Sequence, residues 1–330
     1  MLRRFLLILP LMTSLTIATR GSKLALWQAE HVKARILAVN SGITDISLLV
    51  LKTKGDKILD VPLAKVGGKG LFVKEIEEAL LDGRADLAVH SMKDVPMELP
   101  PELTLGVIIN REDPRDMFLS LRHKTLDDLP LGARVGTSSL RRQAQLLALR
   151  QDLAIIPLRG NVDTRLAKLA KGEFDAIIVA AAGIRRLGLS APHMVALPQT
   201  TLLPAAGQGA LGLEYRKDRS DLSQLLAFLN DDETRRCVLA ERGFLAGLDG
   251  GCQAPMAAHA AIRNGTLTLQ GLLCGFDGKQ AFRESAEGNA ECDPQEAYRL
   301  GLALANKIIQ SGGKKLLKEM TAATDSTPST

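Results

Sequence analysis

The sequence is short of aromatic residues and of cysteine, and each shortage excludes a class of protein. Phe, Tyr and Trp together make up 3% of the 330 residues, so few side chains could stack on the bases of single-stranded nucleic acid. The four cysteines show neither C-x-x-C spacing nor the density of a disulfide-linked secreted scaffold. We therefore expect reduced thiols in a cytoplasmic protein.

Strong net charge and long apolar segments are also missing. The 42 basic and 37 acidic residues leave a net charge of +5, which is too mild to predict a nucleic-acid partner. Residues 1–14 resemble a signal peptide, since Arg3 and Arg4 precede an apolar run from Phe5 to Met12. That run is too short to span a bilayer, and no A-x-A-like cleavage site follows it. We expect an N-terminal extension and no membrane partner.

Alternating apolar strands and amphipathic helices predict two α/β lobes. The predicted strands cover residues 47–51, 86–90, 155–158 and 176–179, and the predicted helices cover residues 24–39, 71–81, 140–150 and 162–171. The junctions Gly83-Arg84-Ala85-Asp86 and Gly172-Glu173-Phe174-Asp175 share one pattern, a helix end followed by an apolar strand. That likeness indicates two lobes of similar construction, although such junctions are common in α/β proteins.

The last third of the chain has the pattern of a small α+β domain. Asn264-Gly265 separates two apolar strands, which is a strong hairpin signal, and Asp277-Gly278 precedes a third strand. Helices are predicted over residues 222–229, 233–246 and 294–311, and residues 203–210 are predicted to cross back to the first lobe. We place lobe 1 at residues 15–109 and 210–228, lobe 2 at 112–207, the α+β domain at 231–320, and disordered extensions at 1–14 and 321–330.

Cys252 lies on a loop whose shape is set by its neighbours. Gly250 and Gly251 precede it and Pro255 follows, so the backbone can turn sharply and a bulky group can approach the thiol. The alternative is a free thiol that fills a gap, because unpaired cysteine is among the most buried residue types. The loop by itself hints at a reactive or derivatised sulfur.

Two other loops carry residues suited to an anion site. A buried strand leads into Lys93 and Asp94, at the strand end where ligands bind in open α/β sheets; the alternative is a surface ion pair of little energetic value. The loop Ala64–Gly70 contains Lys65 and Lys69 among its glycines but lacks the spacing of a phosphate loop. That loop is either a basic flap over an anionic ligand or a solvated surface loop.

Arginines gather at helix starts and strand ends of the second lobe. Six of them stand at such positions: Arg141, Arg142, Arg159, Arg165, Arg185 and Arg186. Arg141 and Arg142 fall in a first helical turn, where cations oppose the helix dipole, so we expect a bound anion to offset the cost. Arginine pairs bidentately with carboxylate or phosphate, and the sequence leaves both ligands open. Arg20 and Ser22 offer another anion site, with an ordinary helix N-cap as the alternative.

Seven motifs, in order, resemble those of the porphobilinogen deaminases, also called hydroxymethylbilane synthases. They are T-R-G-S, K-V-G-G-K-G-L-F-V-K-E, H-S-M-K-D-V-P, G-T-S-S-L-R-R, L-R-G-N-V-x-T-R, P-A-A-G-Q-G-A and G-G-C-Q-A-P. The resemblance covers residues 15–310. Lys23 is a departure, since the family commonly has proline at that position of R-x-S-P-L-A, and it concerns only that helix start.

The resemblance implies a fold, an activity and a cofactor. The fold would be two lobes like those of periplasmic binding proteins, with a cleft between them, plus a domain with a three-stranded antiparallel sheet that carries the cysteine loop. The activity would be a transferase reaction of haem-type tetrapyrrole biosynthesis, in which four porphobilinogen molecules condense head to tail with loss of ammonia and water releases hydroxymethylbilane. The cofactor would be one dipyrromethane per chain, joined by a thioether to Cys252. The resemblance implies a monomer without a metal ion.

The resemblance also assigns site residues by position. Asp94 would be catalytic: it would accept pyrrole N–H bonds, stabilise the cationic azafulvene formed when ammonia leaves, and assist proton loss, and nearby cations should keep it ionised. Besides Cys252, the cofactor-binding residues would be Ser91, Lys93, Thr137, Ser138, Ser139, Arg141, Arg142, Arg159, Gly160 and Arg165. The substrate-binding residues would be Arg20, Ser22, Lys65, Lys69, Phe72, Arg186 and Gln208.

Two other classes of protein fit part of the pattern. A binding protein with two α/β lobes and a basic cleft would only capture an anionic ligand, but an aspartate at a strand end beside a loop-borne cysteine argues against pure binding. A phosphate-using transferase is disfavoured because the sequence contains no phosphate loop and no metal–carboxylate cluster.

Overall fold

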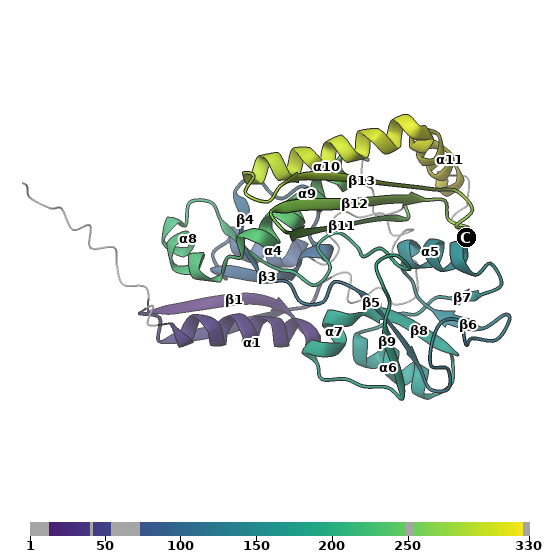
Figure 1. Cartoon of the computed structure of the whole chain (residues 1–330). Helices are drawn as coiled ribbons and strands as arrows, with labels where there is room; N and C mark the ends of the chain where they lie inside the picture. The colour runs from purple at the N-terminus through teal and green to yellow at the C-terminus, as the bar shows by residue number, and fades with distance from the viewer. Residues whose placement is uncertain (1–12, 40–41, 54–72, 249–253, 326–330) are drawn as a thin grey trace, which may run out of the picture.

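Three β-sheets organise the chain in the computed structural model, which describes residues 13–39, 42–53, 73–248 and 254–325 (Figure 1). Two sheets have five strands each and form two lobes, and the third has three strands. Figure 1 shows the three-stranded sheet and its helices lying across both lobes.

The first lobe is built on a mixed sheet. Its strands are β1 (Ser14–Arg20), β2 (Asp45–Leu51), β3 (Leu87–Ser91), β4 (Leu103–Ile109) and β10 (Leu211–Arg216), in the order β2-β1-β3-β10-β4. β1 runs parallel to β2 and β3, whereas β10 is antiparallel to both of its neighbours. The helical segments are α1 (Lys23–Ala38), α4 (Lys74–Leu81), the 3₁₀ turn η1 (Met92–Asp94), α8 (Ser220–Leu226) and the 3₁₀ turn η2 (Ala227–Leu229).

Side chains alternate along these strands, so a helix covers each face of the sheet. Ile17 and Ala18 are neighbours on β1 and point to opposite faces. Ile17 packs with Val32 of α1, and Ala18 packs with Ile76 of α4 and Ala88 of β3. The strand ends are thereby held between two helices, and the loops that follow β1 and β3 open at one edge.

The second lobe repeats this plan. Its elements are β5 (Asp116–Ser120), β6 (Arg134–Gly136), α5 (Leu140–Leu149), β7 (Ala154–Ile156), α6 (Val162–Ala170), β8 (Ala176–Ala180), α7 (Ala181–Arg186) and β9 (His193–Ala196). The strand order is β7-β6-β8-β5-β9, with β6 parallel to β7 and β8 and with β5 antiparallel to its neighbours. In each lobe the fourth strand is the one that the chain enters just after crossing from the other lobe. The predicted fold class, two similar α/β lobes, is confirmed.

The remaining elements form the predicted α+β unit. They are α9 (Asp232–Gly247), β11 (Met256–Arg263), β12 (Thr266–Cys274), β13 (Ala281–Asn289), α10 (Pro294–Ile308), the π-helical turn η3 (Ile309–Gly313) and α11 (Lys314–Asp325). Asn264 and Gly265 have φ values of 50° and 76°, as a two-residue hairpin turn requires. α9 and α10 pack very closely, because a Cβ atom on Gly301 would lie 2.1 Å from the Ala240 carbonyl oxygen.

One buried carboxylate joins this unit to both crossings between the lobes. Glu241 on α9 accepts hydrogen bonds from Arg111 Nη1 (2.6 Å) on the first crossing, from the Gly207 amide (2.6 Å) on the second, and from the Ala260 amide (2.7 Å) of β11. Burial alone would raise the pKa of Glu241, but Arg111 and His259 lower it to about 2. An ionised side chain therefore holds the two crossings together.

The sequence patterns missed several elements. β4, β5, β9, α7 and α11 were not anticipated, and α11 continues through Asp325, past the predicted start of a disordered tail at Thr321. Gly312 has a φ of 117°, so the two glycines there mark a kink between helices and not the end of helical structure.

Candidate active site

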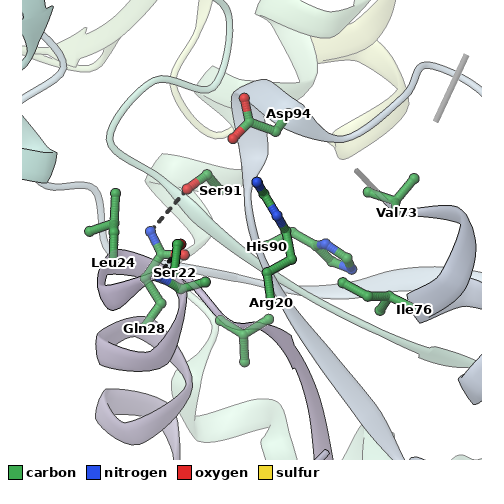
Figure 2. Close-up of a pocket in the computed structure, with 11 residues that line it drawn as sticks. Arg20, Ser22, Leu24, Gln28, Val73, Ile76, His90, Ser91 and Asp94 are labelled. Carbon is green, nitrogen blue, oxygen red and sulfur yellow. Dashed lines mark hydrogen bonds between the residues drawn. The ribbon is translucent and has the colours of Figure 1, made fainter. Parts of the chain in front are cut away.

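A pocket opens where two parallel strands of the first lobe end (Figure 2). β1 ends at Arg20 and β3 ends at Ser91, and the carboxyl ends of parallel neighbours lie side by side. The polar residues of the lining are Arg20, Ser22, Gln28, His90, Ser91 and Asp94. The structure thus brings four predicted site residues, Arg20, Ser22, Ser91 and Asp94, into one pocket.

Hydrogen bonds from α1 fix part of the pocket wall. Gln28 is buried and its Nε2 donates to Ser91 Oγ at 2.9 Å, the contact drawn in Figure 2. Ser22 is the N-cap of α1, and its hydroxyl accepts from the Ala25 amide at 3.2 Å. Asp94 is exposed, so its carboxylate is open to a ligand.

Charges from both lobes meet around Asp94. Desolvation and the charge of Arg142 lower the pKa of Arg165, on α6, to about 10, while the charge of Asp94 opposes the shift. Desolvation likewise lowers the pKa of Lys93 to about 8; Asp94 opposes this shift and Arg142 adds to it. Lys93 itself is an exposed residue, as Asp94 is. Lys93 therefore lies within electrostatic range of Arg142 of the other lobe, and Asp94 lies within range of Arg165.

Arg141 and Arg142 are buried against an acid that the sequence analysis did not single out. Asp116, the first residue of β5, is completely buried and accepts from Arg141 Nη1 (2.7 Å) and Nη2 (3.2 Å) and from Arg142 Nε (3.0 Å) and Nη2 (2.8 Å). Burial alone would raise the pKa of Asp116, but the two guanidinium groups hold it well below its usual range.

The two arginines also bond to backbone carbonyls. Arg141 Nη1 donates to the Leu203 oxygen at 2.7 Å, and Arg142 Nη1 donates to the Ile178 oxygen at 3.1 Å. The anion expected at this helix start is therefore supplied in part by the protein's own Asp116. The two arginines and one carboxylate leave the cluster with an excess of one positive charge. The predicted contact of Arg141 and Arg142 with a cofactor stays a prediction.

Three predicted hydroxyl groups shape the turn that starts α5. Thr137 Oγ1 accepts from the Ser139 amide (3.2 Å), Ser138 Oγ donates to the Leu158 carbonyl (3.0 Å), and Ser139 Oγ caps the helix by accepting from the Arg142 amide (3.4 Å). They hold the turn in place; their predicted bonds to ligand carboxylates are untested.

The loop after β7 brings Arg159 and Gly160 to the start of α6. Gly160 has a φ of 106°, a left-handed conformation that favours glycine, and its carbonyl accepts from Arg165 Nε at 2.8 Å. The charge of Arg159 acts on Arg165, so the two cations lie near each other on the second-lobe side of the cleft.

Arg186 lies where the two lobes touch. It ends α7, donates Nη2 to the Gly209 carbonyl at 2.7 Å, and places its guanidinium carbon 5.8 Å from the ring centre of Trp27 on α1. That ring stacks on His31 with centroids 5.0 Å apart, and the distance to Arg186 is within the cation–π range. Arg186 therefore already has contacts with the first lobe, and its predicted hold on substrate stays a prediction.

Gln208 is buried away from the pocket of Figure 2. Its Nε2 donates to the Pro114 carbonyl at 2.7 Å and to Asp116 Oδ1 at 2.9 Å, so the amide extends the cluster of Asp116 and the two arginines. Gln208 is not among the residues that line the first-lobe pocket. Its predicted contact with substrate stays a prediction.

Four predicted site residues, Lys65, Lys69, Phe72 and Cys252, lie outside the described residues, so their roles stay predictions. The surroundings of the other three thiols raise their pKa values. Burial raises the pKa of Cys237 to about 12 and that of Cys274 to about 11, and desolvation also raises the pKa of Cys292. All three are protonated at neutral pH and are poor nucleophiles.

Sequence reasoning missed Gln28, Trp27 and Asp116. Gln28 could have been noticed as a polar residue on the face of α1 that the apolar spacing buries. Trp27 is the single tryptophan of the chain, which was a weaker signal. Asp116 gave no signal, because its partners stand 25 and 26 residues later in the sequence.

Within the described ranges, no group of three or more His, Cys, Asp or Glu side chains is placed to hold a metal ion. In the same part of the chain, no helix combines the length and the apolar character needed to cross a membrane.

Two family models match most of the chain. The model of the porphobilinogen deaminase dipyromethane cofactor binding domain matches residues 15–224, and that of the porphobilinogen deaminase C-terminal domain matches residues 235–310. Among solved structures, the periplasmic aliphatic sulphonate binding protein SsuA from Escherichia coli aligns with 72% of this chain and 71% of its own chain, at 15% identity and a TM-score of 0.39.

Curated relatives match over nearly their whole length. The porphobilinogen deaminase of Nitratidesulfovibrio vulgaris (strain DSM 19637 / Miyazaki F) is 61% identical, over 94% of this chain and 98% of that protein. The enzyme of Lawsonia intracellularis is 58% identical over 94% and 99%, and that of Chromobacterium violaceum is 54% identical over 94% and 99%. On both family models and on relatives of this similarity, the chain belongs to the porphobilinogen deaminase family.

Proposed function

We propose that this chain joins four porphobilinogen molecules head to tail on a covalently bound dipyrromethane, loses ammonia at each addition, and releases hydroxymethylbilane by hydrolysis. The observation that carries the proposal is the exposed carboxylate of Asp94 in the pocket at the ends of β1 and β3, which Arg20 also lines; Lys93 and Arg165 lie within range of the charge of Asp94. Porphobilinogen has two carboxylates and a cationic aminomethyl group, so its binding and reaction call for charges of both signs.

The residues of the cleft fit a dipyrromethane. Each of its rings carries an acetate and a propionate, and Lys93, Arg159 and Arg165 would hold these groups by charge-assisted hydrogen bonds. The excess positive charge of the cluster around Asp116 would favour the same groups. When bound, the dipyrromethane supplies the free pyrrole carbon to which the first substrate unit is joined. A thioether to Cys252 is part of the proposal and would make the attachment permanent.

Asp94 would have two tasks in each addition. Its carboxylate would stabilise the positive charge that develops on the substrate methylene carbon as the carbon–nitrogen bond breaks and ammonia leaves with the electron pair. It would also accept the proton that the pyrrole carbon loses once the new carbon–carbon bond has formed. Arg20, in the same pocket, would hold a substrate carboxylate.

Intact mass before and after addition of porphobilinogen tests the proposal. The purified protein should exceed its sequence mass by two pyrrole units on the peptide that contains Cys252, and substrate should add further units in steps while ammonia is released. A protein that only captures an anionic ligand would have the sequence mass and release no ammonia. Cys252→Ser should abolish both the added mass and turnover, whereas the control Cys292→Ser should keep both.

A further inference from the structure

One face of α1, in the first lobe, lies against helices of the second lobe, and Figure 1 shows α7 beside one end of α1. Lys23, Trp27 and His31 follow one another at intervals of four residues, so they share that face of the helix. Lys23 Nζ lies 3.2 Å from Asp163 Oδ2 on α6, and the guanidinium group of Arg186 on α7 lies over the Trp27 ring. The two lobes therefore touch directly, in addition to being joined by the two crossings of the chain.

Leu24 connects this contact to the pocket. It lines the pocket at the end of β1, and it also lies over Gly183, a buried residue of α7. A Cβ atom on Gly183 would be 3.5 Å from Leu24 Cδ2 of the first lobe and 3.5 Å from Val162 Cγ2 of the second, which are ordinary contact distances. One side chain thus serves both the pocket wall and the contact between the lobes.

The position of Lys23 is unfavourable for the helix alone. Lys23 is the first residue of α1, where a cation opposes the helix dipole and where the related motif commonly has proline, a residue suited to a first helical position. Asp163 lies in the first turn of α6, where an acid is favoured. It also occupies the variable position of L-R-G-N-V-x-T-R. A partner on the other lobe therefore offsets the local cost of Lys23.

We propose that this face of α1 is a clasp between the lobes, in which the Lys23–Asp163 ion pair holds the lobes together and the Trp27 ring positions Arg186. An exposed ion pair adds little to the stability of a fold, and the Lys23 side chain is 73% exposed. A small energy is sufficient here, because it has to shift only the balance between lobes in contact and lobes apart, by about two- to five-fold. The effect of the clasp on turnover, but not the clasp itself, rests on the proposed function.

Charge reversal tests the ion pair in the holoenzyme without substrate, with Trp27, the single tryptophan of the chain, as the reporter. Lys23→Glu and Asp163→Lys should each expose the half-buried Trp27 ring and raise its fluorescence-quenching constant with acrylamide, which is uncharged. The double variant Lys23→Glu/Asp163→Lys should return to the parent value. Salt at about 1 M should raise the constant in the parent, because the Debye length falls to about 3 Å.

The matched control reverses a charge that lies within one lobe. Lys74→Glu changes a pair with Glu78 that is confined to α4, so it should quench like the parent. Equal quenching in the parent and in both single variants would overturn the clasp. A double variant that quenches like the single variants would also overturn it, because reversal restores an ion pair only where the two side chains face each other.

Turnover with porphobilinogen tests the positioning of Arg186. Trp27→Leu removes the ring and should raise KM by about two- to five-fold with kcat nearly unchanged, as the loss of an exposed cation–π contact predicts. Trp27→Phe keeps an aromatic face and should restore most of the affinity. Leu37→Ala, at an exposed position of the same helix, is the control and should keep the parent KM.

A KM of Trp27→Leu equal to that of the parent would overturn the positioning role of the ring. Absence of turnover in every variant, the parent included, would instead count against the proposed function, and the quenching result would still decide whether the clasp exists.

Discussion

Each lobe places one aspartate beside arginines, but the two carboxylates differ in their surroundings. Asp94 of the first lobe is exposed at a strand end, whereas Asp116 of the second is fully buried and bonded to Arg141, Arg142 and Gln208. Because protein donors occupy the carboxylate oxygens of Asp116, it can position its arginine partners. The carboxylate of Asp94 is accessible and can contact a ligand. Burial and hydrogen bonding, more than nearness to arginine, thus separate the catalytic candidate from the positioning one.

The largest effect on stability should come from Asp116→Asn. It leaves two buried guanidinium groups without their counter-ion, so the free energy of unfolding should fall by about 3–5 kcal/mol, measured by urea unfolding. Asp218→Asn, which removes an exposed partner of Arg216, is the control and should leave the midpoint nearly unchanged.

Asp116→Asn should also change how the free energy of unfolding depends on pH. Because the folded-state pKa of Asp116 is lowered, its contribution is present above the unfolded value of about 3.9 and is lost as pH falls below it. As pH falls, the free energy of unfolding should therefore decrease less in Asp116→Asn than in the parent. An equal decrease in both proteins would show that the ionised Asp116 does not stabilise the cluster.

Asp94→Asn should have the opposite effect to Asp116→Asn, because it should abolish turnover and leave the stability of the fold unchanged. Removal of a charge that stabilises a developing cation should lower kcat by about 100-fold or more, while the urea midpoint stays near that of the parent because Asp94 is exposed. Asp82→Asn, an exposed acid of the same lobe, should keep full turnover. A kcat within about two-fold of the parent at saturating substrate would remove Asp94 from the mechanism.

Arg186→Leu should have a smaller effect on turnover, confined to the steps in which porphobilinogen units are added. The dipyrromethane should stay attached in the mass spectrum, but kcat/KM should fall by about 10- to 100-fold, since a hydrogen bond to a charged group contributes roughly 1.5–3 kcal/mol. The adjacent Arg185, paired with Glu112 and Asp113, is the matched control as Arg185→Leu. Loss of the attached group in Arg186→Leu would show that this arginine serves the cofactor and not the substrate.

The smallest expected change is a shift in the reactivity of Lys93. Its pKa of about 8 is lowered by desolvation and partly restored by Asp94, so Asp94→Asn should lower it further. Competitive labelling of amines, followed by peptide mapping, should then show the Lys93 curve displaced to lower pH, with Lys315 on α11 as the reference. A displacement to higher pH would contradict the assigned electrostatics.

The sequence predicted most of the first-lobe pocket because strand ends and helix starts have local signals. Asp94 follows an apolar strand, and Ser22 precedes an amphipathic helix, so the loops could be placed before the fold was known. Asp116 could not be found this way. Its pairing with Arg141 and Arg142 arises only when β5, entered from the other lobe, is laid against the start of α5.

The burial of Gln208 and the contact of Arg186 with Trp27 depend in the same way on contacts between distant segments. Sequence patterns therefore identified the charged residues of the cleft better than they identified which charges the protein itself neutralises. Motif positions could name Arg141 for a ligand, but its partners within the fold are visible only in three dimensions.

The most direct test of a single site built from both lobes is a double-mutant cycle on kcat/KM with Asp94→Asn and Arg165→Gln. The charges of these two residues act on each other, so the double variant should lose less than the product of the single losses, with a coupling of at least about 0.5 kcal/mol. Asp94→Asn combined with Arg185→Gln should show simple multiplication. Losses that multiply for Asp94 and Arg165 as well would contradict a shared site.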